Sequence, residues 1–437
     1  MSFSRGACTD SKVATSSSSC GSQLDHSTPE ECLQIWVNTA DSWKDSLTTP
    51  LYILESAYLM TVPLARDGGM TAWVLVEKSR LPNERDVLCS CETSRKRSLL
   101  SDNMGNVTEG IVHGIASIFC PGNIRGRGYA ARHMKEIAKV LRGQSENGQI
   151  FESVLYSDIG KEYYYTRLGW TPNSVNEHLV LPPAKMENPA TSQPVFESNL
   201  EGLCSRDEVM IRGDMATPSV SRKRVIILPD LDHMLWHIRK EDFATKHIFG
   251  NEAAAKGAIA GVPGKQVWAI WVRRYYGHPD HHSGEDADDP NVLYILRLVV
   301  EGDETANNTR EGNFTAPMED YADQAVALKA VMQAAQAEAA DWRLDQVQLW
   351  DPSPMARCLL GQSDLNAVVV ERQTHSITSV LWFEDGEGLG LEKAPVLTNN
   401  EHYAWCKKSS EIHSSTTQSS SSNSDRVKTL FLTKRLR

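Results

Sequence analysis

The chain has 437 residues, a formal net charge of −11 and 41% apolar residues. This length predicts about two to three domains, each large enough to bury its own core. The negative charge argues against a general nucleic-acid-binding protein. No run approaches the roughly 18 apolar residues that span a bilayer. We therefore expect neither nucleic acid nor a membrane among its partners, and the sequence does not indicate an oligomeric state.

The nine cysteines are scattered without the spacing of a metal site, and their number is odd. The N-terminal stretch is rich in serine and lacks the apolar core of a secretory signal. Together these features favour reduced thiols and a location in the cytosol. His233 and His237 are one helical turn apart, but the glutamate of a zinc-protease motif is missing, so we expect no metal.

The first predicted elements are two helices, the second near residues 51–59, followed by three strands. Residues 1–27 are expected to form a disordered tail. Thr28 and Glu31 have the spacing of a capping box, with a proline at the first helical position, which predicts a helix start. Apolar, β-compatible runs predict strands over 71–77, 86–92 and 110–119. The polar, basic stretch 93–106 is expected to be a loop or the beginning of the next strand.

A basic turn with two glycines follows the third of these strands and precedes a helix. Gly126 and Gly128 lie among arginines, and the apolar residues of 131–141 repeat at helical spacing. Free N–H groups and the dipole at a helix start favour an anion there, and glycine lets the backbone approach it closely. The turn lacks the signature of a P-loop or of a dinucleotide fingerprint. We predict a site for a phosphate-like anion.

Two motifs in this region resemble those of the GNAT superfamily of acetyl-CoA-dependent acyltransferases. Arg125-x-x-Gly128-x-Ala130 is similar to the superfamily's pyrophosphate loop. Residues 164–170, Tyr-Tyr-Thr-Arg-Leu-Gly-Trp, are similar to its Phe-Tyr-x-x-Leu-Gly-Phe motif. The resemblance implies an α/β fold with a GNAT-type mixed sheet flanked by helices, and acetyl-CoA as cosubstrate. The expected layout is completed by a strand over 151–156, a helix over 160–168 and a closing strand over 178–181.

The rest of the chain predicts a second α/β domain. We expect a GNAT acetyltransferase domain over 28–182, a linker over 183–205, a C-terminal α/β domain over 206–406, and a disordered Ser-rich and basic tail over 407–437. The predicted elements of the C-terminal domain are 225–228, 229–248, 266–272, 293–300, 322–342, 347–350, 367–370 and 377–383. From residue 293 onward their order repeats the second half of a GNAT layout, but the equivalent loop, 301–320, lacks the Arg-x-x-Gly-x-Gly/Ala motif. A degenerate GNAT-like unit without cofactor and an unrelated α/β domain both fit.

The resemblance also implies which residues bind acetyl-CoA. In GNAT relatives the loop holds the pyrophosphate, and the bulged strand before it holds the pantetheine and polarises the acetyl carbonyl. Carried over to this chain, the cofactor-binding residues are Ile118, Phe119, Cys120, Arg125, Gly126, Arg127, Gly128, Tyr129, Ala130 and Asp158. Asp158 departs from the pattern, because relatives often carry an asparagine there.

A motif identifies a candidate for the catalytic acid, but none identifies the base. Tyr165 matches the tyrosine that protonates the leaving thiolate, and a phenol of pKa about 10 can serve a thiolate of pKa about 8.5. Tyr164 is expected to pack. An amine of pKa about 10.4 is protonated at neutral pH, so a base must accept its proton. His113, entering the central strand, and Glu92, ending the neighbouring strand, are both candidates, and either could instead be a solvated strand-end residue.

Over residues 28–406 the chain also resembles one GNAT branch, the fungal lysine N-acetyltransferase-like proteins with their own C-terminal domain. The resembling segments are 91–97, 113–119, 155–160, 293–298, 335–342 and 400–406. This resemblance implies a small-molecule amine substrate, the side-chain amine of free lysine. Two alternatives stay open: the same chemistry on a protein lysine or a specialised-metabolite amine, and a non-catalytic CoA-binding scaffold.

Overall fold

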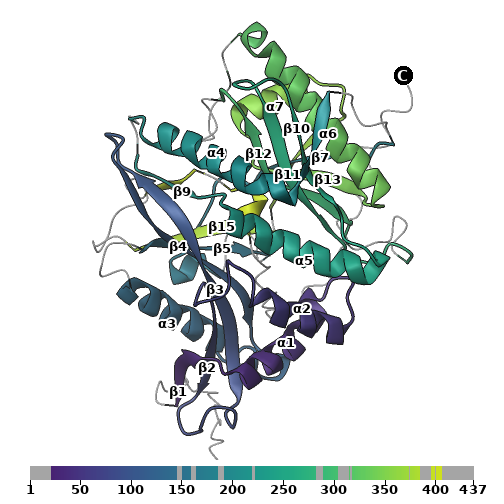
Figure 1. Ribbon diagram of the computed structural model, residues 1–437. Helices are drawn as coiled ribbons and strands as arrows, with labels where there is room; N and C mark the ends of the chain where they lie inside the picture. The colour runs from purple at the N-terminus through teal and green to yellow at the C-terminus, as the bar shows by residue number, and fades with distance from the viewer. Residues whose placement is uncertain are drawn as a thin grey trace, which may run out of the picture.

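The computed structural model of the chain contains two mixed sheets that are flanked by helices (Figure 1). It describes residues 21–144, 150–158, 164–185, 191–218, 222–281, 289–303, 314, 317–373, 375–383, 395–398 and 400–405. Within these ranges no helix has both the length and the apolarity of a bilayer-spanning segment. The expected α/β fold with a GNAT-type sheet is confirmed.

The first sheet occupies the lower part of Figure 1. In spatial order its main strands are β1 (Ser22–His26), β2 (Met70–Glu77), β3 (Val87–Ser101), β4 (Val107–Phe119), β5 (Ile150–Ser157), β15 (Ile377–Trp382) and β6 (Thr171–Pro172). Two further strands, β9 (Arg224–Ile227) and β16 (Val396–Leu397), extend it beside the far half of β3. Helices α1 (Pro29–Trp43) and α2 (Thr49–Leu59) cover one face, and α3 (Tyr129–Gln144) covers the other.

The second sheet lies above the first in the same view. Its strands, in spatial order, are β14 (Val368–Glu371), β7 (Glu177–Leu181), β13 (Gln346–Trp350), β12 (Val292–Val300), β11 (Val267–Arg274), β10 (Ala255–Ala260) and β8 (Ser192–Phe196). Helices α6 (Ala322–Asp341) and α7 (Pro354–Gly361) pack on one face, and α4 (Glu197–Met215) and α5 (Leu231–Phe249) on the other. Single turns of 3₁₀ helix, η1 (Gly122–Ile124), η3 (Thr166–Leu168), η4 (Met318–Tyr321) and η5 (His402–Ala404), connect these elements.

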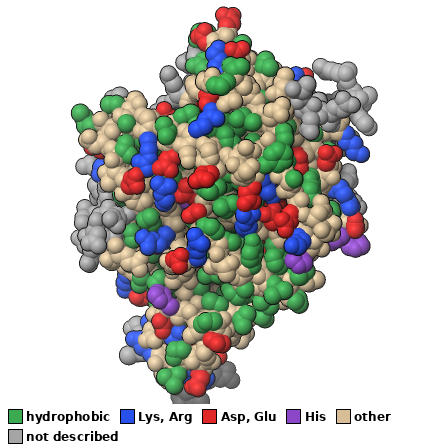
Figure 2. All heavy atoms as spheres, viewed as in Figure 1, with side chains coloured by type: hydrophobic (Ala, Val, Ile, Leu, Met, Phe, Trp, Pro, Cys, Tyr) green, Lys and Arg blue, Asp and Glu red, His purple; other side chains and the backbone are tan. Residues whose placement is uncertain are grey.

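Local signals in the sequence account for several of these elements. The capping box at the start of α1 is confirmed, because Glu31 N–H donates to Thr28 Oγ1 at 3.1 Å and Thr28 N–H donates to Glu31 Oε2 at 3.0 Å. The alanine-rich helix α6 buries most of its alanines, whose small side chains let it lie close to the second sheet. Acidic and basic side chains are interspersed over the face seen in Figure 2.

Two strands are exchanged between the halves of the chain. The strand predicted to close the first domain, β7, pairs in the second sheet with β13 and β14. In return, β15 from the second half pairs antiparallel with β5 in the first sheet, with Val380 opposite Val154. β9 also joins the first sheet, beside β3. The prediction that each sheet is built from one continuous stretch was wrong, because an apolar strand pattern does not specify which sheet receives the strand.

Three further elements differ from their predictions. Residues 22–26 were expected in the tail, yet they form β1 along β2. The polar stretch after residue 92 continues β3 to Ser101, paired with β4, and its alternate polar side chains Ser94, Lys96 and Ser98 are buried. The expected linker contains β8 and the start of α4. The helix expected over 160–168 is seen only as η3, since residues 159–163 lie outside the described part of the chain.

The strand exchange predicts that residues 21–185 cannot fold alone. Without β15 and β9, β5 and the far half of β3 would be open apolar edges. We expect this fragment to be aggregated or to lack a cooperative thermal transition, and co-expression with residues 186–437 to restore both solubility and a cooperative transition. Circular dichroism melts and size-exclusion chromatography measure this, with the full chain as control. A soluble fragment with a sharp melt of its own would contradict the exchange.

Candidate functional site

The central strands of the first sheet separate at their carboxyl ends. Parallel pairing between β4 and β5 ends at Ile115 and Leu155, although β4 continues to Phe119. On its other side β4 pairs with β3, and there β4 contains one extra residue. Glu92 lies opposite Ala116, but Ser90, two residues earlier in β3, lies opposite Phe119, three residues later in β4. The backbone of Ser117, inside this bulge, has a φ of +56°. A bulge that is held in this left-handed conformation re-aims the backbone at the opening between the strands.

The loop after β4 has the properties of an anion-binding turn. Gly126 and Gly128 have φ values of +78° and +82°, which favour glycine, and α3 begins immediately afterwards. The first helical hydrogen bond of α3 runs from Arg132 N–H to Gly128 O, at 3.1 Å, so earlier N–H groups point out of the helix end. Arg125 Nε donates to Cys120 O at 2.9 Å, and its guanidinium lies 5.4 Å from the centre of the Phe119 ring.

The residues of this loop fit a diphosphate. The exposed Arg127 and the half-buried Arg125 supply positive charge, and the α3 N-terminus supplies N–H donors. No side chain at Gly126 or Gly128 obstructs the backbone, and open space surrounds both α-carbons. The predicted cofactor residues from Ile118 to Ala130 are therefore brought together at one end of the first sheet. Their contacts with acetyl-CoA stay a prediction.

The two candidate bases lie on opposite faces of the first sheet. Ser117 Oγ donates to Glu92 Oε2 at 2.7 Å, and the two residues are 3% and 4% exposed. Glu92 shares its face with its cross-strand partner Ala116, which clusters with Leu59 of α2 and Trp236 of α5. Glu92 therefore lies at the bulge, beneath the helices of the α2 and α5 side.

His113 lies away from that side. It lies on the same face of β4 as Ile111 and Ile115, which are two residues away on either side and pack in the core beneath α3. Burial, helped by the nearby Arg95, lowers the pKa of His113 to about 4. The imidazole is thus neutral at physiological pH but is directed to the face opposite Glu92. The geometry favours Glu92 over His113 as the base.

The tyrosine motif packs beneath α3, close to the end of β4. Tyr165 is 4% exposed and belongs to the same core cluster as Ile118 and Ala130. Its ring makes an edge contact with Tyr164 at a centroid distance of 5.1 Å. The Tyr164 hydroxyl is buried without a hydrogen-bond partner among the described residues, and burial, with Tyr165, Cys89 and Cys120 nearby, raises its pKa. Tyr163 lies outside the described residues.

Asp158 has a structural contact that the sequence did not indicate. Its Oδ1 accepts from Ser376 N–H at 2.8 Å, just before the exchanged strand β15. The carboxylate therefore ties the end of β5, beside the strand opening, to the segment from the second half. This bond explains how an acidic side chain is accommodated where relatives often carry an asparagine.

A small polar cavity on the α2 and α5 side was missed by sequence reasoning. It has a volume of about 30 Å³ and is bordered by the α1–α2 loop, α5, β11 and the η5 segment. Its polar atoms without hydrogen-bond partners among the described residues are Ser46 Oγ, Glu55 Oε1, Arg274 Nη1, His402 Nδ1 and Trp405 Nε1. His237, which also lines it, lies 5.1 Å from the ring of Trp236, the neighbour of Ala116.

This polar cavity presents both charge signs to a ligand. Glu55 and Asp45 are acidic, whereas Lys240 and Arg274 are basic, and they form two ion pairs, Arg274 with Asp45 at 3.0 Å and Lys240 with Glu55 at 2.6 Å. Buried polar atoms without partners are costly, so a site of this kind is suited to a ligand that supplies the missing hydrogen bonds. Part of its lining comes from segment 400–406, which the sequence had indicated only as one of the segments that resemble the branch.

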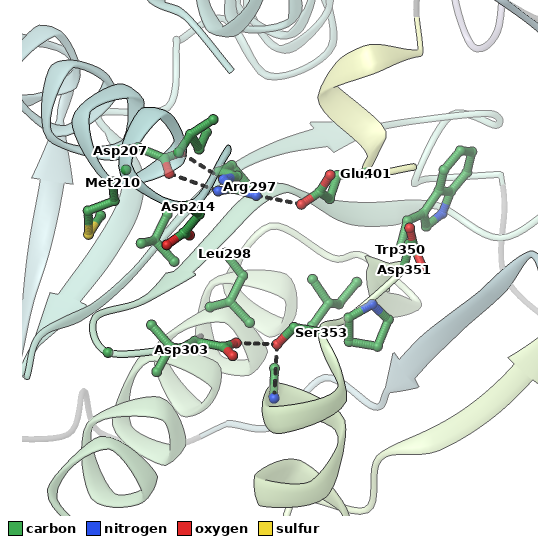
Figure 3. Close-up of a pocket in the computed structure, with 18 residues that line it drawn as sticks. Asp207, Met210, Asp214, Arg297, Leu298, Asp303, Trp350, Asp351, Ser353 and Glu401 are labelled. Atoms are coloured by element: carbon green, nitrogen blue, oxygen red, sulfur yellow. Dashed lines mark hydrogen bonds and ion pairs between the residues drawn. The ribbon is translucent and has the colours of Figure 1, made fainter. Parts of the chain in front are cut away.

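The second sheet has a similar opening between two central strands, but the side chains around it are mainly acidic, whereas the turn at the first opening is basic. Pairing between β12 and β13 ends at Ile295 and Leu349, and β12 carries an extra residue, Leu296. A cavity of about 320 Å³ lies at this opening. Figure 3 shows Arg297 between Asp207 and Glu401, with Nε–Oδ2 and Nη1–Oε1 distances of 2.7 and 2.5 Å. The degenerate GNAT-like geometry that was one of the two expectations for this half is confirmed.

The lining of this second cavity does not suit a diphosphate. Besides Asp207 and Glu401, it includes Asp214, Asp303 and Asp351, against the single cation Arg297. Asp303 accepts a hydrogen bond from Ser353, the N-cap residue of α7 (Figure 3). A phosphate-bearing ligand would be repelled by this excess of carboxylates. Among the described residues, no group of three or more His, Cys, Asp or Glu side chains is arranged to hold a metal ion.

Comparisons with known proteins agree with the expected family. The family model described as the LYC1 GNAT-like C-terminal domain matches residues 178–406, more than half of the chain, and begins in the exchanged strand β7. No curated protein sequence matches. Several solved structures are similar at low identity, among them a GCN5-related N-acetyltransferase from Anabaena variabilis, with 12% identity, coverage of 83% of this chain and 73% of that chain, and a TM-score of 0.43.

Two other similar structures are an N-myristoyltransferase and a tandem GNAT protein. Saccharomyces cerevisiae N-myristoyltransferase, solved with bound myristoyl-CoA and inhibitors, has 9% identity, covers 92% of this chain and 88% of its own, and has a TM-score of 0.43. A tandem GNAT protein from the clavulanic acid biosynthesis pathway has 9% identity, covers 84% of this chain and 100% of its own, and has a TM-score of 0.40.

Proposed function

Because the chain belongs to the LYC1 GNAT-like family, we propose that it transfers the acetyl group of acetyl-CoA to a primary amine, with the side-chain amine of free L-lysine as the first candidate acceptor. The proposal is supported above all by one arrangement. The bulge at Ser117, the basic glycine turn before α3 and the carboxylate of Glu92 meet at the same strand opening. We place this activity in the cytosol as part of the same proposal.

The residues at this opening have complementary tasks in acetyl transfer. Arg125, Arg127 and the α3 N-terminus bind the diphosphate of acetyl-CoA, and the backbone of the bulged strand supplies donors for the oxyanion. Glu92 accepts the proton of the attacking ammonium, directly or through a water. The amine nitrogen then forms a bond to the carbonyl carbon while the carbon–sulfur bond breaks. Tyr165 donates a proton to the departing thiolate.

The polar cavity next to Trp236 and His237 has a volume of about 30 Å³, so it fits at most one charged end of an acceptor and not a whole amino acid. A free amino acid carries one carboxylate and one ammonium on its α-carbon, and the cavity borders carry Arg274 and Lys240 as well as Glu55 and Asp45. Groups of both signs favour a zwitterion over a neutral amine.

The experiment is an assay of thiol release from acetyl-CoA with a panel of amines. The panel contains L-lysine, Nα-acetyl-lysine amide as a protein-lysine mimic, cadaverine and L-ornithine. We expect release that depends on L-lysine, and a loss in kcat of about 10²-fold in Tyr165→Phe, because the thiolate then departs without its acid. Tyr164→Phe is the matched control and should lose much less. Preference for the amide would favour a protein acceptor, and acetyl-CoA binding without turnover on any amine would favour a scaffold.

A further inference from the structure

Two thiols face each other directly beneath the glycine turn. Ser90 and Phe119 are cross-strand partners at the end of the β3–β4 ladder, so the next two residues outward, Cys89 and Cys120, lie opposite each other. Cys89 belongs to the core beneath α3, and Cys120 packs against the same core. The Cys89 thiol donates to Ser90 O at 3.9 Å, and the Cys120 sulfur is near enough to influence its pKa. Opposed residues in a ladder have Cβ atoms about 4.5–5.5 Å apart, whereas a disulfide needs about 3.5–4.5 Å, so the two sulfurs can join after a small shift of Cys120 toward Cys89.

The surroundings of Cys120 favour its thiolate. The Cys89 thiol, the Arg125 guanidinium and the backbone N–H of Ala130 at the start of α3 all lie near its sulfur. These groups lower the pKa of Cys120 despite its partial burial. The same helix end that is suited to a diphosphate therefore also stabilises a negative sulfur.

The two cysteines differ in access and in protonation. Cys120 is half-buried, whereas Cys89 is fully buried. Burial and the neighbouring sulfur of Cys120 raise the pKa of Cys89, which stays a thiol and donates its hydrogen. A partly accessible thiolate next to a buried thiol has the asymmetry of an attacking and a resolving cysteine.

We propose that Cys120 is a peroxide-reactive site and that Cys89 is its resolving thiol. The Cys120 sulfur attacks one oxygen of a hydroperoxide, so that a sulfur–oxygen bond forms, the oxygen–oxygen bond breaks and hydroxide or alkoxide departs. Cys89 then gives up its proton and attacks the sulfenic sulfur. The new disulfide forms as water departs, and a dithiol reductant reverses the reaction.

Disulfide formation would alter the glycine turn. Arg125 Nε is bonded to the carbonyl oxygen of Cys120, so a shift of Cys120 toward Cys89 moves the arginine that borders the anion site. The Cys120 sulfur would also move away from the backbone N–H of Ala130 at the start of α3. This consequence rests on the proposed function, whereas the oxidation chemistry of the two cysteines does not. We expect the oxidised protein to need about tenfold more acetyl-CoA for half-maximal binding, equivalent to about 1.4 kcal/mol.

The test treats the purified full chain with hydrogen peroxide at neutral pH and identifies the products by peptide mass spectrometry. We expect a Cys89–Cys120 disulfide that dithiothreitol removes. Cys89→Ser should instead accumulate a sulfenic acid on Cys120 that dimedone labels, and Cys120→Ser should form neither product. Cys358→Ser is the matched control, because Cys358 is also half-buried but lies on α7, and it should behave as the unsubstituted chain.

Two outcomes would overturn the proposal. One is a Cys120 that stays reduced at a peroxide concentration that oxidises Cys358, and the other is an oxidised Cys120 that never pairs with Cys89.

A second measurement does not depend on any variant. The rate of iodoacetamide alkylation at Cys120 should rise through a midpoint below the usual thiol value of about 8.5 as the pH increases. Isothermal titration of acetyl-CoA into the reduced and oxidised protein tests the effect on the turn, and equal affinities would overturn that effect.

Discussion

Replacing Glu92 with glutamine should lower kcat for amine acetylation by about 10²-fold, with little change in the KM for acetyl-CoA. Glutamine keeps the size of the side chain and can still accept from Ser117 Oγ, but it cannot take a proton from the ammonium of the acceptor. The anion-binding turn is formed by other residues, so cosubstrate binding should persist. Steady-state kinetics with the preferred amine and varied acetyl-CoA measure both quantities.

His113→Gln is the matched control for Glu92→Gln. Both changes replace a buried titratable side chain on adjacent strands, but His113 faces the core beneath α3. We expect a lower melting temperature for His113→Gln with a kcat that falls far less than that of Glu92→Gln. The reverse ranking would assign proton transfer to the α3 side of the sheet and contradict the placement of the acceptor.

Replacing Gly128 with alanine should raise the KM for acetyl-CoA by at least about tenfold. Its φ of +82° costs an L-residue about 1–2 kcal/mol, although no atom lies within 4 Å of the added methyl group. The turn is exposed and can relax to a negative φ, which would redirect its N–H groups away from the diphosphate. Acetyl-CoA titration and steady-state kinetics measure the loss of affinity, and a melting curve measures stability.

Gly143 provides the control for that substitution. It also has open space around its α-carbon, but it lies in the last turn of α3 without a positive φ. Alanine there should leave the KM unchanged and raise stability by about 0.5–1 kcal/mol, because alanine is the better helix former. Equal KM values for the two alanine variants would show that the conformation of the turn does not govern binding of acetyl-CoA.

Local patterns were sufficient to predict most individual elements. The capping box located α1, the apolar runs located β2, β11 and β12, and the glycine turn located the start of α3. These signals are read from neighbours along the chain. The partner of a strand depends instead on distant segments, and both β7 and β15 carry apolar patterns that either sheet can bury. The sequence therefore predicted these strands but not their sheets.

The same distinction applies to the candidate site. The bulge at Ser117 inverts the side-chain alternation beyond it, and a single extra residue is enough to decide which face a side chain occupies. His113 and Glu92 lie before this bulge, in the regular part of the β3–β4 ladder, which places them on opposite faces; the sequence does not give that register, so it did not distinguish them as bases. The polar cavity was missed because its lining comes from the α1–α2 loop, α5, β11 and η5, which are far apart along the chain. A motif of neighbouring residues cannot predict that these distant segments line one cavity.

The exchange of β7 and β15 also affects the order of events during synthesis. The first sheet holds the glycine turn that we propose binds acetyl-CoA, yet its strand β15 lies more than two hundred residues after its partner β5. Until that late segment leaves the ribosome, the earlier half carries an open edge and must be protected from aggregation. The active conformation can then appear only once nearly the whole chain has been made. Early termination of translation would thus yield inactive fragments rather than a shortened, working enzyme.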